Sequence, residues 1–289
     1  MTDQTDGDAA PLSSVRRVRL LGGESTGKST LADLLARRFA TAWVLEWGRP
    51  YSDPKDRSGE PWTTADFIEI ATRQNELEDV TARRADRILL CDTDAMTTGI
   101  WHVEYLGRRD PTVEALGADR HYDLSLLLEP DIPWRQDGMR DSDRARRRQQ
   151  ATLVERLGEL GQSYVTISGD VDDRLLAAER AIAAALDESP APSDVDWVAL
   201  GRAGTWLDLD PPVGLGTRIV RGTGLSAALV QARLDEGGLT YSDLADVLAV
   251  DRAAIREADW YASRHGELAY AELRGDTAAM TELRSRPAI

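Results

Sequence analysis

The chain has 289 residues and a formal net charge of −15, and this length predicts one large domain or one domain with an appendage. The negative charge repels phosphodiester backbones and no basic patch stands out against it, so nucleic acid is not expected as a partner. Cys91 is the single cysteine, which excludes an intramolecular disulfide framework and a multi-cysteine zinc site and indicates a reducing, cytoplasmic location.

The first residues, MTDQTDGDAAPLSS, are acidic and polar. A secretory signal needs a basic start and an apolar run, and no apolar stretch of the chain is long enough to span a bilayer. We expect a disordered leader at residues 1–14 and no contact with a membrane.

Strand and helix patterns alternate from residue 15 to residue 187. Short apolar runs that end in turn residues or carboxylates predict strands at residues 15–21, 42–46, 87–92, 123–129 and 163–167. Apolar side chains at helical spacing predict helices at residues 28–39, 95–106, 111–117, 141–161 and 171–186. Another long helix is opened by a loose capping box of Thr63 and Asp66. The alternation predicts an α/β fold, in which a parallel sheet is wrapped by helices on both faces and binds ligands at the carboxyl ends of its strands.

Two segments are predicted to lack regular secondary structure. Residues 47–62 are rich in Pro, Gly, Asp and Ser and are expected to form a loop. Residues 189–193, SPAPS, predict a linker, because two prolines among small polar residues disfavour a helix. The predicted organisation is a P-loop domain at 15–187, a linker at 188–210 and a small domain at 211–289, with helical patterns at residues 226–236, 240–249 and 252–263.

A phosphate-binding loop is predicted where GGESTGKS, residues 22–29, satisfies G-x-x-x-x-G-K-[ST] between a predicted strand and a predicted helix. Gly22 and Gly27 permit a backbone path on which successive N–H groups face phosphate oxygens at the helix N-terminus. Lys28 is expected to hold the β- and γ-phosphates, and the Ser29 hydroxyl to ligate magnesium. The predicted nucleotide-binding residues are Gly23, Glu24, Ser25, Thr26, Gly27, Lys28 and Ser29. The motif predicts a P-loop NTPase fold with ATP and Mg²⁺ as cofactors.

Carboxylates are expected beside this loop, because the apolar run at residues 88–91 ends in Asp92-Thr93-Asp94. Magnesium keeps several waters and takes one or two carboxylates, so one aspartate can bind it through water while the other orients the acceptor. Asp92 is the predicted metal and catalytic residue. For Asp94, contact with the acceptor and capping of the next helix are equal alternatives, and Cys91 is expected to be a small buried apolar residue.

The acceptor side is predicted at residues 46–51, EWGRPY, where a carboxylate, aromatic rings and a guanidinium follow the second strand. Phosphorylation of a hydroxyl needs a carboxylate that takes the proton, and Glu46 is the candidate. A flat ring stacks on an aromatic face, and a pyridinium cation gains further attraction from it. The predicted acceptor-binding residues are Glu46, Trp47, Arg49, Tyr51, Asp94 and Trp134. The alternative is that the aromatic side chains are core or rim residues and that Glu46 only pairs with Arg49.

A lid is predicted at residues 134–140 and the arginine-dense helix that follows. A kinase of a small metabolite must exclude water from the transferring phosphoryl group, and a segment that carries arginines can close over it and neutralise the developing charge. Arg140 and Arg148 are the candidates, and the alternative for such a charge run is a solvated helix face.

Four strings, GGESTGKSTLA, EWGRPY, CDTDAMTTGIW and DIPWRQDGMR, resemble the ribosylnicotinamide kinase domain of the bacterial NadR family, over residues 15–187. The resemblance implies ATP-dependent phosphorylation of the 5′-hydroxyl of nicotinamide riboside to nicotinamide mononucleotide. By the same match, Thr30 joins the nucleotide site, Glu46 is the base, and Trp134, Asp137 and Arg140 belong to the acceptor wall and lid. NadR proteins carry a nucleotidyl-transferring domain before the kinase, and adenylyl transfer is not expected of this sequence.

The C-terminal residues 211–267 are similar to small helical domains of the DUF433 and antitoxin-like type, which implies a helix-turn-helix form. Acidic residues outnumber basic ones there, which favours contact with a protein partner or a second copy of the chain over DNA. Three functions stay open from the sequence: a nicotinamide riboside kinase, a kinase of another nucleoside or small metabolite, and a regulator that uses nucleotide binding as a switch. The catalytic base stays open among Asp92, Asp94 and Glu46.

Overall fold

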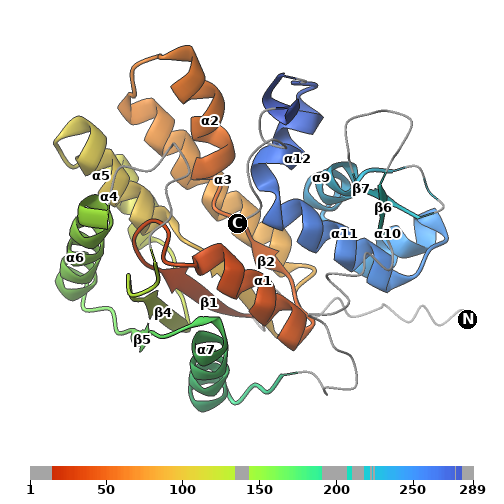
Figure 1. The fold of residues 1–289 in the computed structure, drawn as a ribbon, viewed down its shortest axis with the longest axis horizontal. Coiled ribbons are helices and arrows are strands. Elements are labelled where there is room, and N and C mark those ends of the chain that lie inside the picture. The colour runs from red at the N-terminus through yellow and green to blue at the C-terminus, as the bar shows by residue number, and fades with distance from the viewer. Residues whose placement is uncertain are drawn as a thin grey trace, which may run out of the picture.

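The computed structural model describes residues 15–133, 143–190, 207–209, 218–221, 223, 225–276 and 278–281. Its main body is one sheet with helices on both sides, and a group of helices from the C-terminal part lies at one end of that sheet (Figure 1). The five strands are β1 (Arg16–Leu21), β2 (Trp43–Val44), β3 (Ile88–Asp92), β4 (Leu124–Leu128) and β5 (Val165–Ile167). They run parallel in the order β2-β3-β1-β4-β5. The predicted α/β class is confirmed.

The helices between these strands follow the predicted alternation. They are α1 (Lys28–Phe39), α2 (Gly48–Ser58), α3 (Thr64–Ala82), α4 (Ala95–Leu106), α5 (Pro111–Ala118), α6 (Asp143–Glu159) and α7 (Val171–Leu186). Within β1 the side chains alternate between faces: Val18 and Leu20 pack with α1 and α7, whereas Leu21 packs with α4 and α6 on the opposite face. This alternation buries both faces of the sheet, so the P-loop after β1 is held from two sides.

One predicted element is wrong, because helix α2 occupies most of the segment 47–62 that composition favoured as a loop. Pro50 lies in its first turn, where a missing N–H costs little, but Pro54 lies inside it. Tertiary contacts with α3 and α12 compensate, among them the 2.9 Å ion pair between Lys55 and Asp66. The helix ends at Gly59, which takes a left-handed conformation with φ of 69°.

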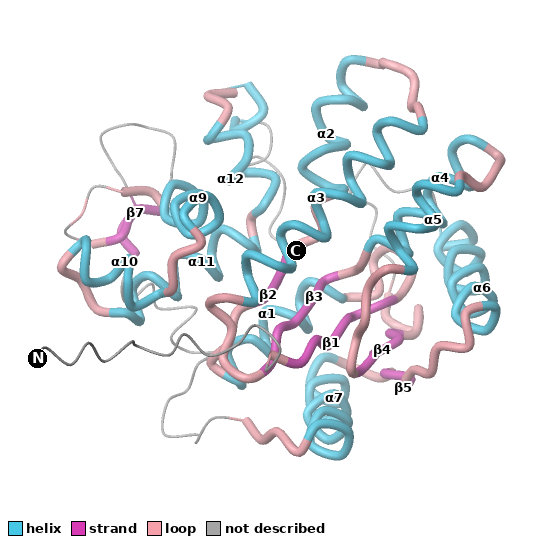
Figure 2. The backbone as a smooth tube through the Cα atoms, turned by 180° about the vertical axis from the view of Figure 1, so that it is seen from behind, coloured by secondary structure: helices cyan, strands magenta, loops and turns pink. Residues whose placement is uncertain are grey.

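The C-terminal part is mainly helical, as predicted. It contains β6 (Leu207–Leu209), β7 (Arg218–Val220), α9 (Ala227–Gly237), α10 (Tyr241–Leu248), α11 (Arg252–Arg264) and α12 (Gly266–Leu273). Strand β6 falls inside the predicted linker and pairs antiparallel with β7, and α12 was not anticipated by the sequence reasoning. Seen from behind, these helices lie beside β2, whereas α6 and α7 lie near β4 and β5 (Figure 2).

The C-terminal helices share a buried core with the sheet. One cluster joins Val44 and Leu89 of the sheet to Leu234 and Ile255 of the C-terminal helices. In α11, Trp260 is buried and its Nε1 donates a 2.8 Å hydrogen bond to the backbone oxygen of Thr41. This helix therefore covers the edge strand β2, which otherwise exposes unpaired backbone groups. The boundaries of the predicted domains stay a prediction.

None of the helices that the structure describes is both long and apolar enough to cross a bilayer.

Candidate nucleotide and acceptor site

The loop between β1 and α1 has the conformation that its glycines were predicted to permit. Gly22 has φ of 150° and Gly27 has φ of 83°, a region that residues with a Cβ rarely adopt. A Cβ added at Gly22 would lie 2.7 Å from Thr26 Oγ1 and 2.9 Å from the backbone oxygen of Leu128. Gly22 is therefore required by the close packing of the loop against the end of β4.

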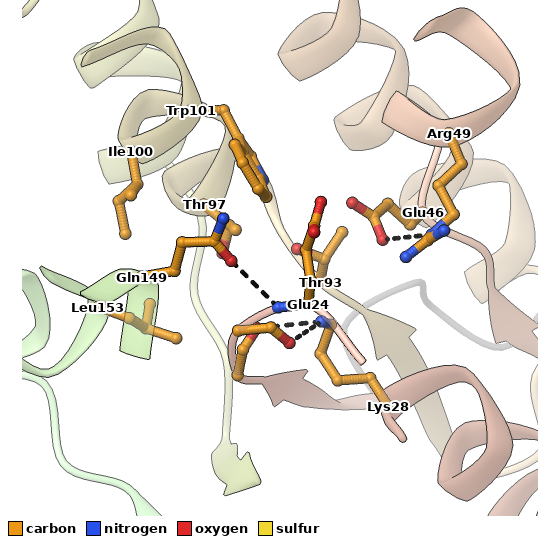
Figure 3. Close-up of a pocket in the computed structure, with 12 residues that line it drawn as sticks. Glu24, Lys28, Glu46, Arg49, Thr93, Thr97, Ile100, Trp101, Gln149 and Leu153 are labelled. Atoms are coloured by element: carbon orange, nitrogen blue, oxygen red, sulfur yellow. Dashed lines mark hydrogen bonds and ion pairs between the residues drawn. The ribbon is translucent and has the colours of Figure 1, made fainter. Parts of the chain in front are cut away.

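The amino group of Lys28 lies over this loop. Its Nζ donates to the backbone oxygens of Gly22 and Gly23 at 3.0 and 3.1 Å (Figure 3), and Thr26 Oγ1 donates to the oxygen of Gly23 at 2.9 Å. The first N–H groups of α1 have no partner four residues earlier in the helix, so they face the loop as donors. Together these groups form an anion site at a helix N-terminus.

Two glutamines of α6 hold the loop, and sequence reasoning missed both. Gln149 Oε1 accepts from the Glu24 amide at 3.2 Å, and Gln150 Oε1 accepts from the Gly23 amide at 3.0 Å. Gln150 Nε2 also donates to the oxygen of Leu128 at 3.1 Å. In the sequence these glutamines sit in a polar helix dense in arginine, and nothing there distinguishes them from a solvated face.

Asp92 lies at the end of β3 and is only 1% exposed. Burial raises the pKa of its carboxyl group to about 6, although the charge of Lys28 and a hydrogen bond from the Ser29 side chain oppose this shift. Its Oδ1 is buried without a hydrogen-bond partner among the described residues. An unpartnered carboxylate oxygen beside a serine hydroxyl fits a divalent cation. The described ranges contain no group of three or more His, Cys, Asp or Glu side chains that could hold a metal by themselves.

Asp94 has the capping role that the sequence left open as an alternative. Its Oδ1 accepts from the backbone N and the Oγ1 of Thr97 at 2.8 and 2.7 Å, and its Oδ2 forms a buried ion pair with Arg19. Both oxygens are therefore engaged by the protein. Asp94 is not among the described residues that line the pocket, and its contact with an acceptor stays a prediction. Cys91 is fully buried, and burial raises the pKa of its thiol, as expected for an apolar role.

A pocket opens above the P-loop, with an empty volume of about 410 Å³ that includes open solvent. Figure 3 shows that Lys28, Glu46 and Arg49 approach it from one side and Trp101 and Gln149 from the other. The described lining residues are Gly22, Gly23, Glu24, Lys28, Glu46, Arg49, Thr93, Thr97, Ile100, Trp101, Gln149 and Leu153. The structure thus brings the predicted phosphate loop and part of the predicted acceptor segment into one cavity.

Glu46 and Arg49 form an ion pair with 3.2 Å between Oε2 and Nε. Burial lowers the pKa of the Arg49 guanidinium, but the carboxylates of Glu46, Glu267, Glu24 and Asp92 together outweigh it and raise that pKa. The guanidinium is therefore charged and surrounded by acidic groups. The predicted alternative, that Glu46 pairs with Arg49, holds in this structure, and both residues also line the pocket.

Trp47 and Tyr51, two of the aromatic residues that the sequence predicts at the acceptor, do not line this pocket. Trp47 packs edge-on against Tyr270, with ring centroids 4.5 Å apart, and the Tyr51 hydroxyl donates to Asp66 Oδ1 at 2.8 Å. Neither belongs to the described pocket lining, whereas Trp101 does. Trp101 could have been found from sequence, because it lies two helical turns after the Asp94 cap, on the helix that follows the second acidic motif.

The structure describes only some of the residues predicted to form the lid. Trp134, Asp137 and Arg140 lie outside the described residues. Arg148 pairs with Glu104 at 3.1 Å, and its side chain is 57% exposed. Arg174 of α7, which the sequence did not single out, is buried and donates to the backbone oxygens of Thr26 and Glu129, so it fixes the P-loop from the other face of the sheet.

Comparison with known proteins gives a family match over the same region. A family model described as an AAA domain matches residues 17–174. The trifunctional NAD biosynthesis/regulator proteins NadR of Escherichia coli (strain K12) and Salmonella typhimurium (strain LT2) are each 37% identical to the chain over 166 residues. That match covers 56% of this chain and 40% of each relative, so the chain spans less than half the length of these relatives.

Solved structures show a similar fold. A NadR protein in complex with NR has a TM-score of 0.54 at 22% identity, covering 64% of this chain and 55% of that one. A NadR protein in complex with NAD and AMP-PNP has a TM-score of 0.53 at 21% identity, covering 63% of this chain and 52% of that one. At this identity the likeness concerns the fold, and together with the family match it confirms the predicted P-loop NTPase-like fold.

Proposed function

This chain belongs to the AAA domain family, and on that premise we propose that it transfers the γ-phosphoryl group of ATP to the 5′-hydroxyl of nicotinamide riboside, giving nicotinamide mononucleotide and ADP. The observation that carries the proposal is the shared pocket, in which Lys28 of the phosphate loop and Glu46 after β2 line one cavity. A kinase needs this arrangement, because phosphate donor and hydroxyl acceptor must meet with their reacting atoms aligned.

Each side chain then has one task. The first turn of α1 and Lys28 bind the β- and γ-phosphates, and Ser29 with Asp92 would hold Mg²⁺, which neutralises charge on those phosphates. The acceptor 5′-oxygen attacks the γ-phosphorus, the bond to the bridging oxygen breaks, ADP leaves with that oxygen, and Glu46 takes the hydroxyl proton. Arg49 orients Glu46 through their 3.2 Å ion pair.

The acceptor ring is assigned to Trp101. A pyridinium cation is attracted to an indole face by about 0.5–2 kcal/mol, and Trp101 is the indole that lines the pocket among the described residues. It takes the stacking role that the sequence gave to Trp47 and Tyr51. The similarity to NadR proteins of two bacteria supports this acceptor. We also propose a cytoplasmic location, because ATP is available there and a reducing compartment keeps the Cys91 thiol reduced.

The C-terminal part is a separate proposal. The matched family region ends at residue 174, so the helix-turn-helix character of residues 211–289 and its contact with a protein partner or a second copy rest on sequence resemblance and on acidic charge. The predicted domain limits of 15–187 and 211–289 rest on the same ground.

One assay tests the function. Purified protein is incubated with Mg²⁺, ATP and a panel of ribosides, and the products are resolved by mass. We expect nicotinamide riboside to gain one phosphate, and Lys28→Ala to abolish the gain. Lys55→Ala is the matched control, because Lys55 is the only other lysine and pairs with Asp66 outside the pocket. Phosphorylation of a different riboside would point to another nucleoside kinase, and nucleotide binding without any phosphorylated acceptor would point to a regulator.

A further inference from the structure

Two consecutive glutamines of α6 bind two consecutive amides of the phosphate loop, but they use their side chains differently. Gln150 uses both ends of its side chain: Oε1 accepts from the Gly23 amide at 3.0 Å, and Nε2 donates to the backbone oxygen of Leu128 at 3.1 Å. Gln149 binds the loop with its oxygen alone, which accepts from the Glu24 amide at 3.2 Å. This contact leaves the Nε2 of Gln149 available to another partner.

The orientation of the Gln149 amide is fixed by its bond to the loop. The Glu24 N–H is a donor, so the atom that faces it must be the side-chain oxygen, and the nitrogen must point away. Among the described residues, none accepts a hydrogen bond from this nitrogen, although Gln149 is only 6% exposed. Figure 3 shows the nitrogen on the side of Thr97 and Trp101, and all three residues line the pocket. The free donor therefore faces the space that a ligand would occupy.

The surface around this nitrogen is mostly apolar. Ile100 and Trp101 of α4 line it together with Leu153 of α6, and the Ile100 and Leu153 side chains belong to one hydrophobic cluster. The Thr97 hydroxyl also lines the pocket, but it already donates to a carboxylate oxygen at 2.7 Å. An apolar surface with a fixed donor orients a ring that carries a hydrogen-bond acceptor.

We propose that Gln149 is a specificity-determining residue, whose Nε2 donates a hydrogen bond to the carbonyl oxygen on the ring of the acceptor. The inference rests on the proposed function, in which the pyridinium ring of the riboside lies on Trp101. Nicotinamide carries a carboxamide on that ring, and the carboxamide oxygen accepts from an amide N–H. A ring without this oxygen leaves Nε2 unpaired in the pocket, so the site discriminates against such a ring.

Gln149 also connects the acceptor to the phosphate loop. The peptide group between Gly23 and Glu24 accepts from Lys28 Nζ at 3.1 Å through its oxygen and donates to Gln149 at 3.2 Å through its nitrogen. The γ-phosphate at Lys28 and the ring at Gln149 are therefore positioned relative to the same peptide group. Transfer between two substrates requires such a fixed relative position.

The test compares nicotinamide riboside with pyridine riboside, which has the same ring charge and no carboxamide. Their dissociation constants, and that of magnesium AMP-PNP, are measured by calorimetry on wild type, Gln149→Met and Gln162→Met. Gln162 is the matched control because it lies outside the described pocket lining and accepts from Arg19 at 2.7 Å. In wild type we expect nicotinamide riboside to bind about five- to tenfold tighter than pyridine riboside. Gln149→Met should reduce this ratio to less than about twofold, whereas Gln162→Met should retain it.

A second variant separates the two ends of the amide. Gln149→Glu keeps an oxygen for the Glu24 amide and replaces the donor by another oxygen. It should therefore weaken nicotinic acid riboside, whose ring carries a carboxylate, by more than about tenfold relative to pyridine riboside. Thermal melting checks that each variant is folded.

The affinity ratio is insensitive to a general disturbance of the loop, because such a disturbance affects both ribosides. An unchanged ratio in Gln149→Met, or a loss confined to AMP-PNP, would overturn the role of Gln149 while the kinase function stands. If wild type neither binds nor phosphorylates nicotinamide riboside, the proposed function itself fails, and this inference fails with it.

Discussion

The Ser29 side chain lies close enough to the carboxylate of Asp92 to lower its pKa, so the first turn of α1 and the end of β3 meet at these two residues. The Oδ1 atom of Asp92 is buried and has no hydrogen-bond partner among the residues that the structure describes. A buried acceptor without a donor is costly, and a hydrated divalent ion would satisfy it. The phosphate-binding motif at residues 22–29 and the acidic motif at residues 92–94 thus meet at one point.

Asp92→Asn keeps the shape of the side chain and removes its charge. We expect the turnover number to fall by about a hundredfold or more, because the magnesium ion that offsets phosphate charge loses its carboxylate. Calorimetry of AMP-PNP with and without Mg²⁺ checks the cause: the variant should lose most of the magnesium dependence of nucleotide affinity. Unchanged magnesium dependence would remove Asp92 from the metal site.

Gly22→Ala is expected to abolish nucleotide binding by displacing the loop. The new Cβ would meet Thr26 Oγ1 at 2.7 Å and the backbone oxygen of Leu128 at 2.9 Å, at a φ of 150°, so the loop must shift. The control is Gly158→Ala, which lies in α6 with nothing within 4 Å and should gain stability by up to about 1 kcal/mol. Fluorescence titration with a labelled ATP analogue measures both variants, and similar affinities for the two would contradict this reading of the loop.

The sheet and the phosphate loop could be predicted because their signals are local. An apolar strand followed by glycines, a lysine and a helix leaves few alternative structures. Each of the strands β1 to β5 lies within a segment that the sequence predicted as a strand. The loop predicted at residues 47–62 was wrong because α2 is stabilised by α3 and α12, which local composition cannot reveal.

The surroundings of Glu46 could be predicted only in part for the same reason. Glu46 and Arg49 were found because they follow a strand directly. Tyr270 lies more than 200 residues after Trp47 in the chain, and the two rings meet where α12 packs against α2. Trp47 was predicted to bind the acceptor, and its contact with Tyr270 is one that the local sequence does not indicate.

Glu78 makes stability depend on pH. Burial raises the pKa of its carboxyl group from 4.5 to about 7, although the hydrogen bond from Tyr122 and the charges of Arg120 and Arg17 oppose this. Because the folded pKa lies above the unfolded value, the folded state binds more protons between pH 4.5 and pH 7, and stability falls as pH rises through that window. Over it the wild type should lose about 3 kcal/mol of unfolding free energy from this group.

Urea unfolding at a series of pH values isolates the contribution of Glu78. Glu78→Gln cannot ionise, so its unfolding free energy should vary less between pH 5 and pH 8 than that of the wild type. Glu76→Gln is the matched control, because Glu76 lies on the same helix with its side chain 55% exposed, and it should retain the wild-type slope. If the unfolding free energies of wild type and Glu78→Gln change with pH in parallel, Glu78 is not the source of the pH dependence.

Arg84 fastens the C-terminal helices to the P-loop part, and its removal should destabilise the whole chain. Its guanidinium is buried and pairs with Asp259 at 3.0 Å and with Asp235 at 2.9 Å, and Asp259 also accepts from the Tyr241 hydroxyl at 2.7 Å. Arg84→Ala leaves two buried carboxylates without their cation, which costs about 3–5 kcal/mol. Arg180, which is exposed on α7, provides the control, since Arg180→Ala should change stability by less than about 1 kcal/mol. Urea unfolding measures both variants. Equal stability of the two variants would mean that these buried pairs do not hold the C-terminal helices in place.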